Sequence, residues 1–284
     1  MVEVLSAGLF TTIQDLGRYK GLAWGVPLSG AMDQTSAGLA NALLNNRKAC
    51  AVLEMTLVGP KLRFHCDTEI CLTGAALQGK INETKAVLLN QPTMVQSGDV
   101  LSFGKSLWGT RAYLAVKGGF QTEQVMQSYS MYAGITSEGN IEKGMLLPIQ
   151  AFSEKNPPKK NSLKLNKAHF ENSVLNVFPG PEFEYLSEGQ KEKLLGRRFT
   201  ISKNNNRMAY TLEELLENEL TPIITSLVQP GTVQLTPAGN IIVLMRDAQT
   251  TGGYPRILQL SEQAMNQLSQ KRTKDWVGFD MVDY

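Results

Sequence analysis

Short apolar stretches that end at glycine, proline or another turn residue recur along the whole of this 284-residue chain. Val2 and Val4 alternate with polar neighbours as strand residues do, and the stretches 62–64, 69–72 and 113–116 have the length of strands. The 25 glycines and 12 prolines supply frequent breaks, which favour short strands over long helices. The sequence therefore predicts a mainly β protein, folded as a sandwich or a barrel.

Capping residues mark where helices begin between these strands. Asp33 can accept the free amide protons at the start of a helix over 34–45. Ser187 and Gln190 have the spacing of a capping box, and Ser261 can begin a last helix. We therefore expect a few short helices within the mainly β chain.

The charged residues are nearly balanced, with 28 Lys and Arg against 26 Asp and Glu and a net charge of +2. This balance argues against nucleic acid or an anionic membrane surface as a partner. Cys50, Cys66 and Cys71 form no CxxC pair and the chain has only two histidines, so no metal site is predicted. An odd number of cysteines suits the reducing cytoplasm.

The start of the chain, Met1 to Leu5, has neither the basic nor the apolar region of a signal peptide. No apolar run approaches the roughly 18 residues that a membrane-spanning helix needs. On these grounds we expect a soluble, cytoplasmic protein that does not bind membranes.

Residues 153–173 interrupt the strand pattern and indicate a division of the chain. Between 153 and 160 lie two prolines and three lysines, a composition typical of a solvated connector. Strand signals resume at 174–178 and again at 241–245. The chain is therefore predicted to consist of an N-terminal lobe over 1–152 and a C-terminal lobe over 174–284, with strands free to cross between them.

The stretch from Gly74 to Lys80 matches the GxxxxGK pattern of a phosphate-binding loop and follows a strand candidate. Ile81 stands where such a loop needs a Ser or Thr for magnesium, and no amphipathic helix follows to hold the anion. We favour a hairpin turn between two strands. Ser29 is not in a GxSxG elbow, and neither His65 nor His169 supports a nucleophilic triad.

Three segments, 11–18, 25–33 and 246–255, combine glycine with polar groups that strands do not require. The pair Gly252-Gly253 lets the backbone approach a ligand closely, and Gln249 offers a donor and an acceptor beside the two following threonine hydroxyls. Arg18 has the guanidinium needed to hold a carboxylate or phosphate through two bonds. The alternative is that these segments are turns, with Asp15 and Asp33 as caps and Arg18 on the surface.

Several motifs occur in an order that resembles one family over nearly the whole chain. They are TIQDLGR at 12–18, GVPLSGAMD at 25–33, AVLEMTLVGP at 51–60, FPGP at 178–181, Asn206-Arg207-Met208, and DAQTTGGYP at 247–255. Together they resemble the KipA-type family, which comprises C subunits of 5-oxoprolinase, also called allophanate hydrolase subunit 2, and belongs to the biotin-dependent carboxyltransferase superfamily. The resemblance implies two cyclophilin-like β-barrel lobes with a few short helices.

The resemblance also implies that the chain works with a KipI-type B subunit and a separate A subunit. The assembled enzyme would open the lactam of 5-oxoproline to glutamate with consumption of ATP, and the chain alone would be inactive. ATP with Mg²⁺ would be shared with the B subunit, where phosphorylation of the lactam oxygen makes the carbon a better target for water. The chain has no Met-Lys biotin-acceptor motif, so biotin is not expected on it.

The roles that follow from the resemblance divide the polar residues into two sets. Arg18 and Arg207 are expected to hold anionic groups, and Asp15, Asp33 or Asp247 to orient an arginine or bind magnesium. The catalytic set is thus Arg18, Asp33, Arg207 and Asp247. The substrate-binding set is Gln14, Asp15, Ser29, Met32, Gln249, Thr250, Thr251, Gly252, Gly253 and Tyr254.

Four positions depart from what relatives in this family tend to show. Asn206 replaces an acidic residue and Thr211 an arginine, while Tyr129 and Met131 lie in a segment that replaces GSRST and so lacks another arginine. If the missing charges touch substrate, the activity changes; if they only pair with each other, their joint loss is neutral. Two other functions stay open: biotin-dependent carboxyl transfer, as in urea carboxylase, and a non-catalytic regulator that binds a KipI-type protein.

Overall fold

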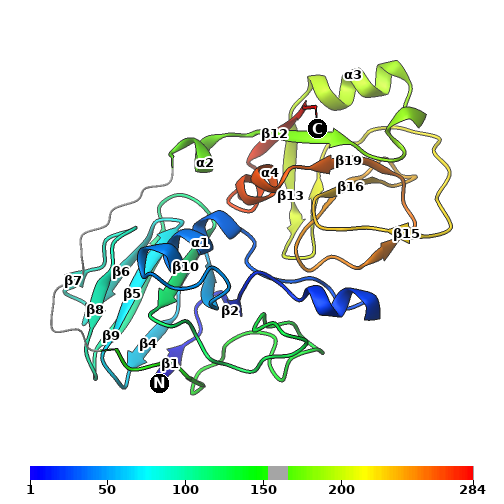
Figure 1. Cartoon of the computed structure of the whole chain (residues 1–284). Coiled ribbons are helices and arrows are strands. Elements are labelled where there is room, and N and C mark those ends of the chain that lie inside the picture. The colour runs from blue at the N-terminus through cyan, green and yellow to red at the C-terminus, as the bar shows by residue number, and fades with distance from the viewer. Residues whose placement is uncertain (153–165, 284) are drawn as a thin grey trace. The chain divides into compact units, whose positions relative to one another are not determined.

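The computed structural model describes residues 1–152 and 166–283 of the chain, and it is mainly β (Figure 1). In chain order the elements are β1 (Val2–Ser6), β2 (Phe10–Gln14), the 3-10 helix η1 (Tyr19–Trp24), α1 (Gln34–Leu43), β3 (Val52–Thr56), β4 (Lys61–Phe64), β5 (Thr68–Gly74), β6 (Leu77–Ile81), β7 (Lys85–Ala86), β8 (Thr93–Val95), β9 (Val100–Ser106), β10 (Arg111–Val116), β11 (Leu146–Leu147), α2 (Ala168–Glu171), β12 (Val174–Pro179), the 3-10 helix η2 (Phe183–Tyr185), α3 (Glu188–Gly196), β13 (Phe199–Asn205), β14 (Ala209–Leu212), β15 (Ser226–Leu227), β16 (Thr232–Leu235), β17 (Ile241–Leu244), β18 (Thr251–Gly252), β19 (Arg256–Leu260), α4 (Glu262–Leu268) and β20 (Trp276–Met281). The prediction of a mainly β fold with a few short helices is confirmed.

Contacts divide the chain into two compact units. Unit 1 contains Met1–Lys20 and Ser29–Asn166, and unit 2 contains Gly21–Leu28 and Lys167–Tyr284. The short segment Gly21–Leu28 therefore belongs with the second unit, although it lies within the predicted N-terminal lobe. Most of the predicted connector, 153–165, lies outside the described residues, and its C-terminal part contains the helix α2. Among the helices that the structure describes, none has the length and apolar character to cross a membrane.

Unit 1 is built from two sheets that enclose a shared core. One sheet has the order β11-β1-β4-β9-β6-β7, and the other has the order β2-β3-β10-β5-β8. Val4 and Phe64 from the first sheet and Leu53 and Leu114 from the second belong to one buried cluster. The strands of this unit therefore form a two-sheet arrangement, whereas the resemblance implied a barrel here.

The five-stranded sheet is buried on both of its faces. Leu114 and Val116 of β10 point into the core between the sheets, whereas Tyr113 and Ala115 belong to a second cluster with α1. Figure 1 shows α1 lying along this sheet. Every residue of β10 is consequently buried, a pattern typical of a central strand covered on two sides.

The helix α1 begins where the sequence predicted. The carboxylate of Asp33 accepts from the Ser36 amide at 3.0 Å and from the Ser36 hydroxyl at 2.6 Å. The helix ends at Leu43, two residues before the predicted end, and Asn45 takes a positive φ of 52° just beyond it. Asp33 therefore acts as a cap, one of the roles the sequence left open.

Unit 2 contains a closed barrel with the order β12-β19-β16-β17-β14-β13-β20 (Figure 1). Its strands pair antiparallel except for β12 and β20, which run parallel. The predicted capping box of Ser187 and Gln190 starts α3, and the hydroxyl of Ser261 accepts from the Ala264 amide at the start of α4. The barrel prediction is thus confirmed in this unit.

The GxxxxGK stretch does not form a phosphate-binding loop. Gly74 ends β5, Lys80 lies inside β6, and no helix follows. The connection also differs from the predicted hairpin, because β5 and β6 belong to different sheets. Gly74 has a φ of +79°, and a Cβ there would lie 2.5 Å from the Arg111 carbonyl oxygen. This glycine is therefore required by the passage of the chain from one sheet to the other.

Gly74→Ala should lower the free energy of unfolding by about 1–3 kcal/mol, because the added Cβ clashes with the backbone of β10. Gly38→Ala is the matched control in unit 1, since a Cβ at this position of α1 meets nothing within 4 Å. The control should gain up to about 1 kcal/mol from helix propensity. Urea unfolding of both variants measures the difference, and equal stability of the two would contradict the argument.

Candidate functional site

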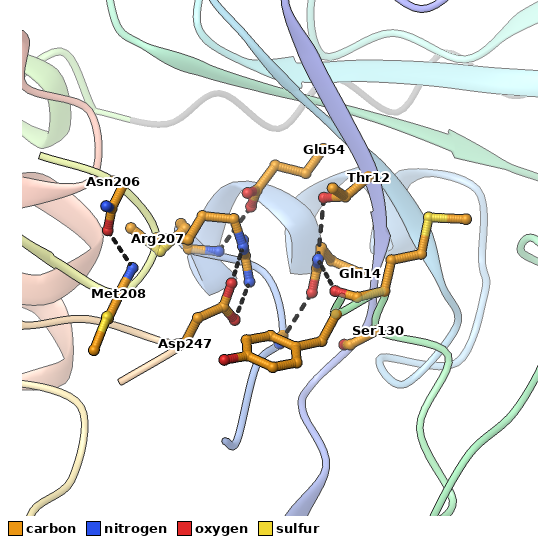
Figure 2. Close-up of polar contacts among 12 residues, drawn as sticks. Thr12, Gln14, Glu54, Ser130, Asn206, Arg207, Met208 and Asp247 are labelled. Carbon is orange, nitrogen blue, oxygen red and sulfur yellow. Dashed lines mark hydrogen bonds and ion pairs between the residues drawn. The ribbon is translucent and has the colours of Figure 1, made fainter. Parts of the chain in front are cut away.

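The backbone from Gly30 to Asp33, here called the 30–33 segment, is held by side chains and backbone of the sheet beside it. The Gly30 amide donates to Oε1 of Gln14 at 3.0 Å, and the Ala31 amide donates to the Asp15 carbonyl at 2.9 Å. Nε2 of Gln14 in turn donates to the Thr12 hydroxyl at 3.0 Å (Figure 2). The amide of Gln14, a predicted substrate-binding group, is therefore engaged within unit 1.

The other half of the 30–33 segment is bound by two side chains from strands β3 and β10. The Met32 amide donates to Oε2 of Glu54 at 2.8 Å, and the Asp33 amide donates to the Tyr113 hydroxyl at 2.8 Å. Tyr113 donates its own proton to Glu54 at 2.8 Å, and Nε of Arg111 lies 3.9 Å from Glu54 Oε1. All four amides of the segment are thus satisfied. The side chain of Met32 is itself fully buried.

Asp15 organises a loop that lies next to this segment. One carboxylate oxygen accepts from the Gly17 amide at 2.8 Å and from the hydroxyls of Ser128 and Ser130 at 2.8 and 2.7 Å. The other accepts from the Tyr129 amide at 2.7 Å. Asp15 is therefore a loop-organising group in this structure.

Arg18 is fully buried, so the alternative that placed it on the surface is wrong. Its Nε donates to the Val125 carbonyl at 3.1 Å, and Nη2 donates to the Ser130 carbonyl at 2.5 Å. These bonds tie the guanidinium to the same loop that Asp15 holds. Its predicted role of holding an anion stays a prediction, and the contacts give it a structural task beside that.

Ser29 differs from its neighbours because its hydroxyl has no hydrogen-bond partner within the described part of the chain. The residue is fully buried, and its φ of 55° is in the left-handed region that side chains rarely adopt. An unsatisfied buried hydroxyl in a strained backbone is a common property of ligand-binding positions. The Ser29 hydroxyl therefore has spare hydrogen-bonding capacity within unit 1.

In unit 2, Arg207 and Asp247 form a two-bond ion pair (Figure 2). Nε of Arg207 donates to one carboxylate oxygen at 2.7 Å and Nη2 to the other at 3.0 Å. The Asp247 amide donates back to the Arg207 carbonyl at 2.9 Å. Of the three aspartates considered for orienting an arginine, Asp247 is the one that makes this pair, which pre-organises the guanidinium.

The loop after Asp247 is anchored by a small two-stranded sheet. β18 pairs with β15, and the Val228 amide donates to the Thr250 carbonyl at 3.0 Å. A Cβ on Gly252 would lie 2.6 Å from Nε2 of Gln234, so the glycine permits a close approach. Gly253 accepts from the Ile223 amide at 2.9 Å through its carbonyl.

Gln249 carries a buried Oε1 atom that has no hydrogen-bond partner among the residues the structure describes. Leaving such an acceptor buried and unpaired costs about 1–3 kcal/mol, unless a ligand supplies the donor. Tyr254 is partly exposed at the end of the same loop. A Cβ on Gly25 would lie 3.8 Å from Oγ1 of Thr250, so the glycine-rich segment at 21–28 runs beside this loop.

The predicted residues therefore fall into two groups, one in each unit. Gln14, Asp15, Arg18, Ser29, Met32 and Asp33 lie in unit 1, and Arg207, Asp247, Gln249, Thr250, Thr251, Gly252, Gly253 and Tyr254 lie in unit 2. The sequence interpretation missed Glu54 and Tyr113, although a charged residue inside the apolar run 51–55 was a visible signal. Among the described residues, no three His, Cys, Asp or Glu side chains gather where they could hold a metal ion.

The four positions that depart from the family pattern all have local structural uses. Oδ1 of Asn206 accepts from the Met208 amide at 2.7 Å (Figure 2), and Thr211 lies in β14 opposite Ile242. Sδ of Met131 accepts from the Ile13 amide at 3.4 Å. Tyr129 and Met131 also line a cavity of about 550 Å³ in unit 1. The residues at these four positions thus make local contacts, although the charged groups that relatives tend to carry there are absent.

Glu182, which follows the FPGP motif, fixes the start of β19 next to the Gln249 loop. Nε and Nη2 of Arg256 donate to its two carboxylate oxygens at 2.9 and 2.8 Å, and the Arg256 amide donates to one of them at 2.8 Å. These bonds lower the pKa of Glu182 below its usual value. A Cβ on Gly180 would lie 2.1 Å from the Arg256 carbonyl oxygen, so the motif packs directly against this strand.

The family model for the carboxyltransferase domain, subdomains A and B, matches residues 24–281, which include the site residues of unit 2 and Ser29, Met32 and Asp33 of unit 1. The chain belongs to this family. The family match spans the Arg207–Asp247 pair, the Gln249 loop and the 30–33 segment. The resemblance of the sequence motifs to the carboxyltransferase family and to 5-oxoprolinase C subunits is confirmed.

The chain is similar to a 5-oxoprolinase subunit, to part of a urea amidolyase and to a protein of known structure. It is 32% identical to the 5-oxoprolinase C subunit of Escherichia coli strain K12, over 95% of this chain and 87% of that protein. It is 41% identical to the urea amidolyase of Lachancea kluyveri over 132 residues, which are 46% of this chain and 7% of that protein. A crystal structure of a protein named TTHA0988 matches with a TM-score of 0.86 and 25% identity, covering 98% of this chain. The chain spans about half, 56%, of the length of that protein.

Glu182→Gln should lower the free energy of unfolding at pH 7 by about 1–2 kcal/mol, because a charged acceptor of three bonds becomes neutral. The pKa of Glu182 is lower in the folded chain than in the unfolded one. The stabilisation is therefore complete above the usual pKa of a glutamate and is lost as the pH falls through the folded value. Urea unfolding at pH 7 and in acid should show a difference between variant and wild type that disappears in acid.

The exposed Glu188, which pairs with Lys191 in α3, provides the control for this measurement. Glu188→Gln should change stability little at either pH, because exposed ion pairs contribute little. A Glu182→Gln difference that persisted unchanged in acid would show that charge is not the cause.

Proposed function

We propose that this chain is the C subunit of an ATP-dependent 5-oxoprolinase, acting with a KipI-type B subunit and with an A subunit. The observation that carries the proposal is the match to the E. coli protein named as the C subunit of 5-oxoprolinase, which covers nearly all of both chains. Because that relative is named as one subunit of an enzyme, the proposal places this chain in a complex of several chains. The motif at 247–255 lies within the residues that the family model matches.

The proposed chemistry explains why ATP is needed. A lactam carbonyl is a weak electrophile, and its oxygen can take the γ-phosphoryl group of ATP with ADP as the leaving group. Water then adds to the activated carbon, and the ring C–N bond breaks as the nitrogen takes a proton, which gives an acyl phosphate of glutamate. A second water hydrolyses this acyl phosphate to glutamate and inorganic phosphate. We propose that the B and C subunits carry out the activation and that hydrolysis is completed by the A subunit.

The groups of unit 2 suit a small substrate with a carboxylate and a lactam. Arg207 is oriented by Asp247, and a guanidinium fixed in this way is suited to bind a carboxylate or phosphate. The buried Oε1 of Gln249 needs a donor, and a lactam N–H is a donor of the right kind. These contacts support the assignment of Arg207 and Gln249 to the substrate in the proposed reaction.

Magnesium does not fit the donors that this chain offers on its own. Within the part of the chain that the structure describes, no cluster of three acidic, His or Cys side chains exists. The carboxylates of Asp15 and Asp33 are engaged by local donors, and that of Asp247 by Arg207. The proposed reaction therefore includes no metal ion held by this chain alone, and we propose that ATP with Mg²⁺ is shared with the B subunit.

A second function, biotin-dependent carboxyl transfer, is favoured by the family description and by the similarity of 132 residues to a urea amidolyase. The chain has no Met-Lys acceptor, so a biotin group would arrive on a separate carrier. A streptavidin blot of the purified complex distinguishes the two functions. A biotinylated partner in the active complex would support carboxyl transfer over the 5-oxoprolinase proposal.

The proposal predicts 5-oxoproline-dependent ATP hydrolysis and glutamate release by this chain when it is mixed with its B and A subunits. Each subunit is omitted in turn as a control, and each omission should abolish glutamate release because the chemistry is divided. Coupled assays of ADP and glutamate measure both products. A complex that assembles but hydrolyses no 5-oxoproline would instead favour another substrate or a regulatory role.

Gln249→Met should leave the free energy of unfolding unchanged or raise it by about 1 kcal/mol, because it removes an unpaired buried acceptor. The same variant should lower kcat/KM of the assembled enzyme about tenfold or more through loss of a substrate hydrogen bond. Gln263→Met is the control, since Gln263 is exposed in α4 and should change neither quantity. A Gln249→Met enzyme with full activity would remove Gln249 from the site.

A further inference from the structure

Glu54 is a charged residue in a place where strands normally carry apolar ones. It lies in β3 between Leu53 and Met55, which belong to the core of unit 1, and only 1% of its surface is exposed. A buried carboxylate is costly unless it is paired and hydrogen-bonded, and an apolar residue of similar size would often serve stability as well. The presence of Glu54 in the core therefore requires an explanation other than packing.

The contacts of Glu54 supply that explanation. Its Oε2 accepts from the Met32 amide and from the Tyr113 hydroxyl, both at 2.8 Å. The oxygen of Tyr113 accepts from the Asp33 amide at 2.8 Å, so the two side chains together bind consecutive amides. Arg111 lies on the same face of the sheet with its Nε 3.9 Å from Glu54. A buried charge is thus used to fix the backbone that follows Ser29.

The protonation of Tyr113 is consistent with this arrangement. Burial raises the pKa of Tyr113 well above its usual value, and the nearby charges of Glu54 and Asp33 raise it further. The phenol therefore keeps its proton at neutral pH and continues to donate to Glu54. The direction of the bonds, from tyrosine to carboxylate and from the Asp33 amide to the tyrosine oxygen, is fixed by this chemistry.

We propose that Glu54 and Tyr113 are positioning residues that hold the 30–33 segment, and with it the Ser29 hydroxyl, in the geometry needed to bind substrate. The test of this inference by enzyme activity rests on the proposed function, whereas its test by hydrogen exchange does not. Ser29 immediately precedes the segment, is fully buried, and has a hydroxyl without a partner in the described chain. A hydroxyl in a strained backbone is useful to a ligand only if the chain next to it cannot relax.

The test uses Glu54→Gln and Tyr113→Phe, which preserve shape and remove the charge or the hydroxyl. Hydrogen exchange of the free chain, followed by mass spectrometry on peptides that cover 29–36, reports on the segment without any assay of activity. Exchange at Met32 and Asp33 should become about tenfold faster in both variants, because Glu54→Gln weakens the acceptor of the Met32 amide and Tyr113→Phe removes that of the Asp33 amide. Because it needs no partner subunit, this arm remains informative even if the assembled wild type does not act on 5-oxoproline.

Glu69→Gln is the matched control, since Glu69 is a buried glutamate of the neighbouring strand β5 in the same sheet. In the assembled enzyme, Glu54→Gln and Tyr113→Phe should lower kcat/KM about tenfold at a temperature where all variants are folded. Glu69→Gln should stay within about twofold of wild type in both exchange at 29–36 and activity, even with a similar loss of thermal stability.

Three results would overturn the proposal. Unchanged exchange at 29–36 in both variants would show that Glu54 and Tyr113 do not hold the segment. Faster exchange with wild-type kcat/KM in an active complex would show that the segment is held but does not serve the reaction. A third result, in which Glu69→Gln loses as much activity as Glu54→Gln, would reduce the effect to general destabilisation and also refute the positioning role.

Discussion

The burial of the five-stranded sheet of unit 1 on both faces is the constraint from which the rest of that unit follows. One face closes the core with the other sheet, and part of the second face is covered by α1 through Ala37 and Ala40. Beyond the start of α1 the cover is the 30–33 segment, a stretch of chain with no ladder partner. Its buried amides need acceptors, and side chains of the sheet must provide them.

That need explains why polar residues occur on strands that are otherwise apolar. Gln14 and Glu54 come from adjacent strands and Tyr113 from the next one in the sheet, and they accept from the amides of Gly30, Met32 and Asp33 in one passing segment. Hydrogen bonds to a carboxylate are stronger than those to neutral acceptors, and Glu54 supplies such an acceptor to the Met32 amide. The fold and the candidate site therefore share the same bonds, and a change in either one alters both.

Local signals in the sequence predicted local structure well, and long-range arrangement poorly. The caps Asp33, Ser187 and Ser261 were predictable because a cap and its target amide are three residues apart. The pairing of strands was not, because alternation identifies a strand without naming its neighbour. The passage at Gly74 shows this: two successive strands in the sequence belong to different sheets, and only the contact with Arg111 reveals why glycine stands there.

The same limit applies to the candidate site. Glycine-rich motifs predicted which segments carry site residues, but they could not show that Asp15 and Arg18 hold a loop more than a hundred residues away. A polar group whose bonds are all made within the chain must give one up before it can bind substrate, and that exchange is costly for a buried group. We therefore propose that in each unit the substrate-binding role belongs to a group with an unpaired buried oxygen, Ser29 in unit 1 and Gln249 in unit 2. In that proposal the internally bonded residues around each of them keep that oxygen in place.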